Sequence, residues 1–216
     1  MADYAIQRRM MVDGQIRTAD VTDRSILQAM LEIPRERFLP PEQAQLAYLD
    51  LDLPVGQGGR RLLRPMVLAK MLQALEVSAE DTVLDVGCAG GYAAAVLASL
   101  SKAVFALEEE PRLAAHAKGA LADLPNVKVV EGKLTDGYAA QAPYDAILLE
   151  GATEQEPEAL CRQLADRGRL VCISGDGPAA KVVVFRRDGE DVTPRVVFDA
   201  AGTVLPGFAK PRVFSF

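Results

Sequence analysis

From residue 82 onward the chain alternates between short apolar runs and helical segments, and this alternation constrains the fold more than any other feature. The apolar runs lack the polar alternation of a strand that has one face in water. Strands of this kind, separated by helices, are typical of a parallel sheet covered on both faces. The expected strands cover residues 82–87, 103–108, 127–132, 144–151 and 169–175, and the expected helices cover 92–101, 111–124 and 157–166.

The two ends of the chain follow other patterns. The stretch "KVVVFRRDGEDVTPRVVF" (181–198) predicts two strands around a turn at Asp188–Gly189, and hence an antiparallel edge. Before residue 80 the pattern is helical, in "VTDRSILQAMLEIP" with Thr22 as N-cap, in "PPEQAQLAYL" and in "RPMVLAKMLQALEV". The sequence therefore predicts a doubly wound, mostly parallel α/β fold with an N-terminal helical extension and an antiparallel C-terminal edge.

Charge and cysteine content exclude several functional classes. The net charge of −6 argues against a protein that binds nucleic acid or an anionic membrane, since either partner requires a basic face. The three cysteines lack C-x-x-C spacing, so we expect reduced thiols and neither a metal site nor a redox motif. No apolar run reaches the length of a signal peptide or of a membrane span, and we expect a cytoplasmic protein.

A glycine-rich turn, "LDVGCAGGYAAAV" (84–96), follows the first expected strand. In an open α/β sheet, ligands bind beyond the carboxyl ends of the strands. The spacing differs from the dinucleotide fingerprint G-x-G-x-x-G, because Ala89 stands where a glycine is required. It fits D-x-G-x-A-x-G, in which the backbone turns around the amino-acid end of S-adenosylmethionine. The candidate cofactor-binding residues of this turn are Asp85, Gly87, Cys88, Ala89, Gly90 and Gly91.

The second expected strand ends in the stretch "ALEEEP" (106–111). Its first acid, Glu108, lies 17 residues after Gly91. A carboxylate at this point can accept hydrogen bonds from both ribose hydroxyls of a nucleotide cofactor. Glu108 is the best placed, whereas Glu109 and Glu110 are interpreted as a solvated turn. The turn and the acid together favour S-adenosylmethionine, and NAD is the weaker alternative.

At this point the sequence resembles the protein-L-isoaspartate O-methyltransferases. The N-terminal stretch "MVDGQIRTADVTDRSILQAMLEIPRERFLPPEQAQLAYLDLDLPVG" is similar to that family's helical extension, and "LDVGCAGGYAAAVLA" to its cofactor loop. The stretches "APYDAILLEGA" and "PEALCRQLADRGRLVCISG" resemble its fourth and fifth strands. The resemblance implies a single domain over 1–216, with the extension and acceptor loop in 1–78 and the Rossmann-like cofactor-binding core in 79–216. It also implies methylation of a carboxylate in isoaspartyl-containing, damaged proteins.

Two positions depart from the pattern of that family. The family has a Thr-Ile-Ser segment before the proline of the acceptor loop, and its serine contacts the reacting carboxylate. The corresponding residues here are Arg61, Leu62 and Leu63, so no hydroxyl remains. The family also has Gly-Asp-Gly after the third strand, with the acid at the adenine amino group. Here Lys133 stands in its place, followed by Leu134, and we expect weaker adenine binding unless a backbone group or Asp136 supplies the missing acceptor.

The chemistry implied by the resemblance requires few catalytic side chains. A carboxylate, with a pKa of about 4, is already ionised at neutral pH and attacks a sulfonium methyl group without a general base. Alignment of the reactants can supply roughly 7–11 kcal/mol. The single histidine, His116, falls in an expected helix and is interpreted as non-catalytic.

The cationic loop "PVGQGGRRLLRP" (54–65) leaves alternatives open. Its arginines either contribute solubility in a solvated loop, or Arg60, Arg61 or Arg64 pairs with an anionic acceptor in place of the serine. A tightly held carboxylate is a weaker nucleophile, which favours binding over turnover. The functional hypotheses are therefore an isoaspartyl methyltransferase, a catalytically impaired cofactor-binding regulatory homologue, and a methyltransferase for another anionic acceptor.

Overall fold

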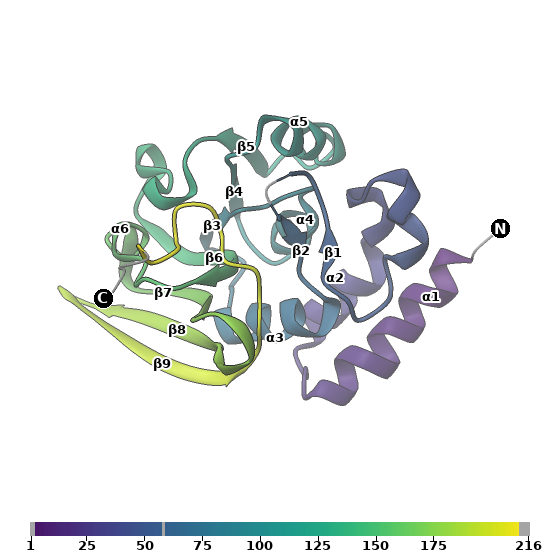
Figure 1. The fold of residues 1–216 in the computed structure, drawn as a ribbon, viewed down its shortest axis with the longest axis horizontal. Coiled ribbons are helices and arrows are strands. Elements are labelled where there is room, and N and C mark those ends of the chain that lie inside the picture. The colour runs from purple at the N-terminus through teal and green to yellow at the C-terminus, as the bar shows by residue number, and fades with distance from the viewer. Residues whose placement is uncertain (1–2, 58, 212–216) are drawn as a thin grey trace, which may run out of the picture.

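A computed structural model describes residues 3–57 and 59–211, and it has a seven-stranded sheet at its centre (Figure 1). The strand order is β5-β4-β3-β6-β7-β8-β9, parallel as far as β7 and antiparallel from β7 to β9. The strands are β3 (Thr82–Val86), β4 (Ala103–Glu108), β5 (Val127–Glu131), β6 (Tyr144–Thr153), β7 (Leu164–Ser174), β8 (Lys181–Asp188) and β9 (Asp191–Asp199). The predicted fold class is confirmed.

Successive residues of these strands enter two separate cores, as the alternation of side chains across a sheet requires. Val83 packs into the larger core, which includes the N-terminal helices and α4 (Tyr92–Ala98). Leu84 packs into the second core, which includes α6 (Glu158–Cys161) and residues of the C-terminal segment. Both faces of the central strands are covered, which explains why those strands are apolar throughout.

The N-terminal extension contains α1 (Tyr4–Met11), α2 (Arg24–Glu32) and α3 (Pro65–Leu75); short π- and 3-10-helical segments connect them, and a small hairpin precedes α3. Pro65 occupies the first turn of α3, where its missing N–H is not needed. The N-cap of α2 is Asp23, not Thr22: the Asp23 carboxylate accepts from the backbone of Ser25 and Ile26. Thr22 lies one residue too early for its side chain to reach the first free N–H groups.

Several expected helices are shorter than the sequence indicates. The stretch at 40–49 forms only 3-10 turns, η4 (Pro41–Leu46). The expected helix at 157–166 ends at Cys161, because β7 already begins at Leu164. α5 (Pro111–Ala120) also ends before its expected end at residue 124, and it packs beside β4 and β5.

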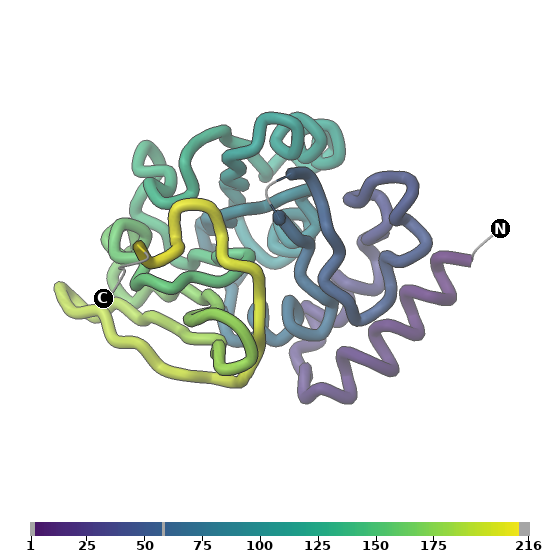
Figure 2. Tube along the Cα trace, viewed as in Figure 1, coloured from purple at the N-terminus to yellow at the C-terminus, as the bar shows by residue number. Residues whose placement is uncertain are grey.

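A small hairpin, β1 (Leu53–Pro54) and β2 (Arg61–Leu62), carries the cationic loop. The tube in Figure 2 shows it between the N-terminal helices and the sheet, while the yellow C-terminal segment crosses in front of the sheet. Leu205 in that segment donates its N–H to Ala152 at the end of β6. The hairpin from the N-terminal part of the chain and the segment around Leu205 from the C-terminal part thus approach the same end of β3 and β6. The boundary between extension and core at residue 78 remains a prediction.

Candidate cofactor site

The glycine-rich turn between β3 and α4 is bonded to the neighbouring strand. The N–H groups of Gly87 and Cys88 both donate to the Leu107 carbonyl, at 2.8 and 3.2 Å. The Gly91 N–H donates to the Cys88 carbonyl at 2.8 Å, and Gly91 has a φ of 96°, which favours glycine. The turn is therefore a rigid link between the ends of β3 and β4.

The glycines of this turn serve different purposes. A Cβ atom on Gly90 would lie 2.2 Å from the Phe38 carbonyl oxygen, and one on Gly91 would lie 2.7 Å from the Leu121 side chain. Packing against the chain itself therefore accounts for both residues. A Cβ on Gly87 would instead face Arg60 and Leu205, at 3.3 and 3.4 Å. Gly87 is the member of the three that faces the candidate site.

Glu108 lies at the end of β4, fully buried, and its carboxylate faces the glycine turn. Its Oε2 accepts from the Ala89 N–H at 2.8 Å, and its Oε1 accepts from the N–H groups of Glu109 and Glu110 at 2.9 and 3.0 Å. Three backbone donors thus hold one carboxylate at the carboxyl edge of the sheet. This is the place at which the sequence predicts an acid for the ribose.

Arg60 fills the space beside Glu108. Its side chain is 4% exposed, and its Nη2 donates both to Glu108 Oε2 at 2.8 Å and to the Gly87 carbonyl at 2.9 Å. Its Nε and Nη1 are buried and find no hydrogen-bond partner among residues 3–57 and 59–211. Arg60 is therefore not a solvated loop charge, since the hairpin inserts it into the candidate cofactor site.

A second buried acid, Glu150 on β6, lies beside Asp85 on β3. Burial raises the pKa of Glu150 to about 7. Burial, together with the Glu150 carboxyl, raises the pKa of Asp85 well above its ordinary value. Within the described part of the chain neither oxygen of Asp85 has a hydrogen-bond partner. The sequence analysis missed Glu150, although an acid inside the apolar run "AILLEGA" was a usable signal.

The candidate acceptor-loop residues lie apart from Glu108. The Leu63 side chain is only 2% exposed and packs in the larger core, while its carbonyl accepts from Arg35 at 2.7 Å. Arg64 forms a two-point pair with Asp52, at 3.2 and 3.1 Å, and Arg61 donates to the Asp52 carbonyl at 3.0 Å. Both arginines are thus engaged within the chain.

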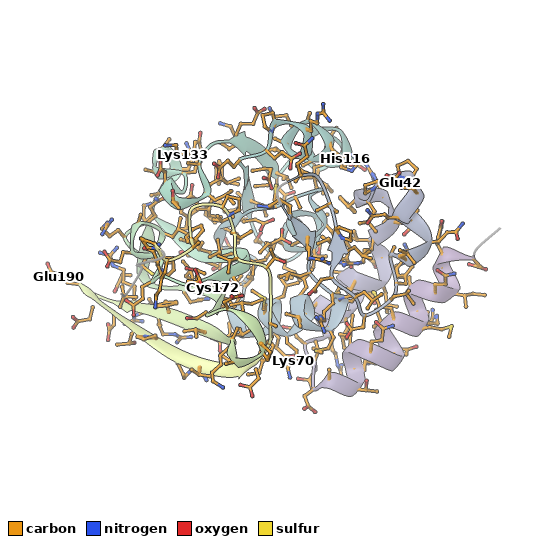
Figure 3. The ribbon with its side chains drawn as sticks, in the orientation of Figure 1. Glu42, Lys70, His116, Lys133, Cys172 and Glu190 are labelled. Atoms are coloured by element: carbon orange, nitrogen blue, oxygen red, sulfur yellow. The ribbon has the colours of Figure 1, made fainter. Side chains whose placement is uncertain are left out.

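The residues after β5 lie at the edge of the site. Leu134 is fully buried, and its N–H donates to Glu109 at 3.4 Å, so Glu109 does more than form a solvated turn. Lys133 is exposed, and Figure 3 places it at one end of the upper edge with His116 toward the other. His116 is exposed on α5, and its ring borders the glycine turn, since a Cβ atom on Gly90 would lie 3.5 Å from it. Glu110 accepts from the Gln57 N–H at 2.8 Å and so tethers the loop between β1 and β2.

The chemistry of this residue set fits an S-adenosyl nucleoside. Glu108 offers an acceptor for sugar hydroxyls, Gly87 has only the movable side chains of Arg60 and Leu205 beside it, and Asp85 contributes buried oxygens that lack a donor. The side chain of Arg60 holds part of the same space, so the fit requires that it move. In the described ranges there is no cluster of three or more metal-ligating side chains. Nor does any described helix have the length and apolar character needed to cross a membrane.

Comparison with known proteins gives consistent matches. The family model for protein-L-isoaspartate(D-aspartate) O-methyltransferase matches residues 7–199. A protein-L-isoaspartate O-methyltransferase from Methanoregula boonei is 42% identical over 185 residues, covering 85% of each chain. One from Roseiflexus sp. is 36% identical over 207 residues, covering 95% of this chain and 94% of the relative.

Two solved structures support the fold alone, because their sequence identities are low. One, a protein-L-isoaspartate O-methyltransferase, has a TM-score of 0.80 at 23% identity, covering 93% of this chain and 66% of that one. The other, from Plasmodium falciparum and named as such a methyltransferase in complex with S-adenosyl-L-homocysteine, has a TM-score of 0.78 at 16% identity, covering 95% and 99%. On the strength of the family match and of these relatives, the chain belongs to the protein-L-isoaspartate(D-aspartate) O-methyltransferase family.

Proposed function

We propose that this protein transfers a methyl group from S-adenosylmethionine to a carboxylate of isoaspartyl residues in damaged proteins. Family membership over most of the chain carries the proposal, because relatives that are about as long as this chain bear that activity in their names. The site at Glu108 supports the cofactor. The three unpaired cysteines are consistent with the expected cytoplasmic location.

The chain's own residues have binding and positioning roles in this proposal. Glu108 would hold the sugar of the cofactor, and Gly87 and Asp85 would lie beside its amino-acid end. The bound cofactor supplies an electrophilic methyl group on a sulfonium. The acceptor carboxylate is ionised at neutral pH, so the protein needs no general base.

The burial of Leu63 favours a second candidate function. An aliphatic side chain in the core offers no donor to an acceptor carboxylate, and Arg61 and Arg64 already have partners within the chain. A cofactor-binding homologue with little isoaspartyl activity, or with another anionic acceptor, is therefore the alternative. Both candidates share the cofactor site and differ in the transfer step.

The decisive experiment incubates the protein with methyl-labelled cofactor and a peptide that contains one isoaspartyl residue. The matched control is the same peptide with an ordinary aspartyl residue. Methyl ester on the isoaspartyl peptide alone supports the proposed function. Cofactor binding without ester on either peptide supports the alternative, and transfer to a small carboxylate in a parallel reaction would identify a different acceptor.

Replacing Leu63 with serine is a poor test of the missing hydroxyl. The Leu63 side chain is almost fully buried, so the substitution removes core packing, at a cost of about 2–5 kcal/mol. We expect L63S to lower stability without restoring activity. The matched control is L49S, because Leu49 is 46% exposed. Restored ester formation in a folded L63S would instead place this residue at the acceptor.

A further inference from the structure

The strongest feature outside the family's own chemistry is the side chain of Arg60, which lies where the cofactor sugar would bind. We propose that Arg60 is an internal competitor for this subsite and that an S-adenosyl nucleoside binds only after displacing it. The inference rests on the proposed function in one respect, the identity of the cofactor. It adds that the affinity of the site is set by a residue from the acceptor loop.

The hydrogen bonds of Glu108 define the competition. Each carboxylate oxygen already accepts two hydrogen bonds: Oε1 from the backbone of Glu109 and Glu110, and Oε2 from the backbone of Ala89 and from Arg60. Of these four donors, the guanidinium alone is a side chain that can rotate away. A ribose hydroxyl that donates to Glu108 must therefore replace Arg60.

Displacement leaves Glu108 with hydrogen-bond partners. Without Arg60 the carboxylate loses its ion-pair partner but keeps three backbone donors, so neither of its oxygens is left without a hydrogen bond. The inserted guanidinium, by contrast, leaves its Nε and Nη1 buried and without acceptors in the described part of the chain. The inserted position thus satisfies only one of the three guanidinium nitrogens, and solvent would satisfy all of them.

The position of Arg60 also connects the site with the acceptor loop. Its carbonyl accepts from the Val55 N–H at 2.9 Å across the small hairpin. Gln57 in the same loop donates to Glu110, two residues after Glu108. Two contacts therefore hold the loop against the end of β4: the Arg60–Glu108 ion pair and the hydrogen bond from Gln57 to Glu110. Cofactor binding would break the first of these. Cofactor binding in this way changes the loop that precedes the acceptor position.

The test measures the affinity for S-adenosylhomocysteine by calorimetry, with no turnover involved. The variants are Arg60→Ala, which removes the competitor, and Arg60→Lys, which keeps a charge but has a single ammonium for both acceptors. The matched control is Arg186→Ala, which removes the same charge away from the site. Arg186 lies on β8, and its side chain is 53% exposed. Thermal unfolding of each protein without ligand verifies that it is folded.

We expect R60A to bind more tightly than the wild type, R60K to fall between them, and R186A to match the wild type. If the inserted form accounts for about nine-tenths of the free protein, its removal raises the affinity about tenfold, since apparent affinity scales with the competent fraction. R60K keeps the measurement possible if R60A is unstable, and its expected affinity also exceeds that of the wild type.

Other results would overturn the inference. Equal affinity in the folded variants and the wild type would show that Arg60 does not compete, while leaving the cofactor assignment intact. Weaker binding in R60A would mean that Arg60 holds the cofactor rather than excluding it. No binding by any of the proteins would reject the competitor together with the proposed cofactor.

Discussion

The carboxylate of Glu108 is bound by four donors, so its replacement affects both stability and binding. We expect E108A to lower the free energy of unfolding by about 1–3 kcal/mol, because the backbone N–H groups of Ala89, Glu109 and Glu110 lose their acceptor while Arg60 can turn to solvent. E108Q keeps the shape, and we expect it to weaken binding of S-adenosylhomocysteine about tenfold or more, on the scale of one hydrogen bond to a charged group.

Urea unfolding and calorimetry measure the two effects separately. Glu131 provides the matched control, because it pairs with Glu108 in register on the neighbouring strand and its side chain is 47% exposed. We expect E131Q to change neither quantity by more than about 1 kcal/mol. Undiminished affinity in a folded E108Q would mean that the sugar binds elsewhere.

Glu150 predicts a dependence of stability on pH. Its pKa is about 7 in the folded protein against an ordinary value of 4.5, because burial disfavours the charged form. Between these pH values the folded state holds a proton that the unfolded state has lost, so wild-type stability falls as the pH rises from about 4.5 to about 7. Asp85 adds to this loss, because burial and the Glu150 carboxyl raise its pKa as well.

Replacing Glu150 with glutamine removes this titration. We expect E150Q to be more stable than the wild type at pH 8, by about 2–3 kcal/mol, and to lose most of that advantage at pH 4.5. Thermal unfolding at a series of pH values tests this expectation, with E158Q as the control at an exposed acid. A stability difference that does not vary with pH would contradict the assigned cause.

At the scale of elements, the start of α2 shows how a cap is selected. Thr22 and Asp23 are both good N-cap residues, and local sequence alone does not separate them. The Gln73 side chain accepts from the backbone N–H of both residues, at 2.7 and 3.2 Å, and fixes the chain before the helix. The Asp23 carboxylate then faces the free N–H groups of Ser25 and Ile26.

Removal of this cap has a predictable cost. We expect D23A to lower the free energy of unfolding by about 1 kcal/mol, since two helical N–H groups lose their acceptor. T22A serves as the control, because only the backbone of Thr22 takes part in the contact with Gln73. Denaturant unfolding of both variants compares them directly, and equal losses would contradict the assignment of Asp23.

At the scale of the whole molecule, Arg35 joins three parts of the chain. It is fully buried, and it donates to the Ala47 carbonyl at 2.8 Å and to the Leu63 carbonyl at 2.7 Å. Its guanidinium also lies 4.8 Å from the centre of the Tyr92 ring at the start of α4. Burial lowers the pKa of Arg35, because removing the guanidinium from water disfavours its charged form. These contacts must therefore offset the desolvation of a cation.

We expect R35M to destabilise the protein by about 3–5 kcal/mol, because two buried carbonyls lose a charged donor. The control is R37M, since Arg37 pairs with Asp123 at the surface with its side chain 43% exposed. Urea unfolding measures both. A loss in R35M as small as that in R37M would show that the extension is held by apolar packing alone.

The sequence by itself determined the parallel α/β core, the glycine turn and the place of Glu108. Those features follow from local periodicity and from the rule that ligand sites form at the carboxyl ends of parallel strands. The tertiary structure alone decided that Arg60 enters the site, that Leu63 is buried and that Glu150 meets Asp85. Arg60 and Glu108 are 48 residues apart, and such contacts depend on how distant segments pack, which no local pattern of residues encodes.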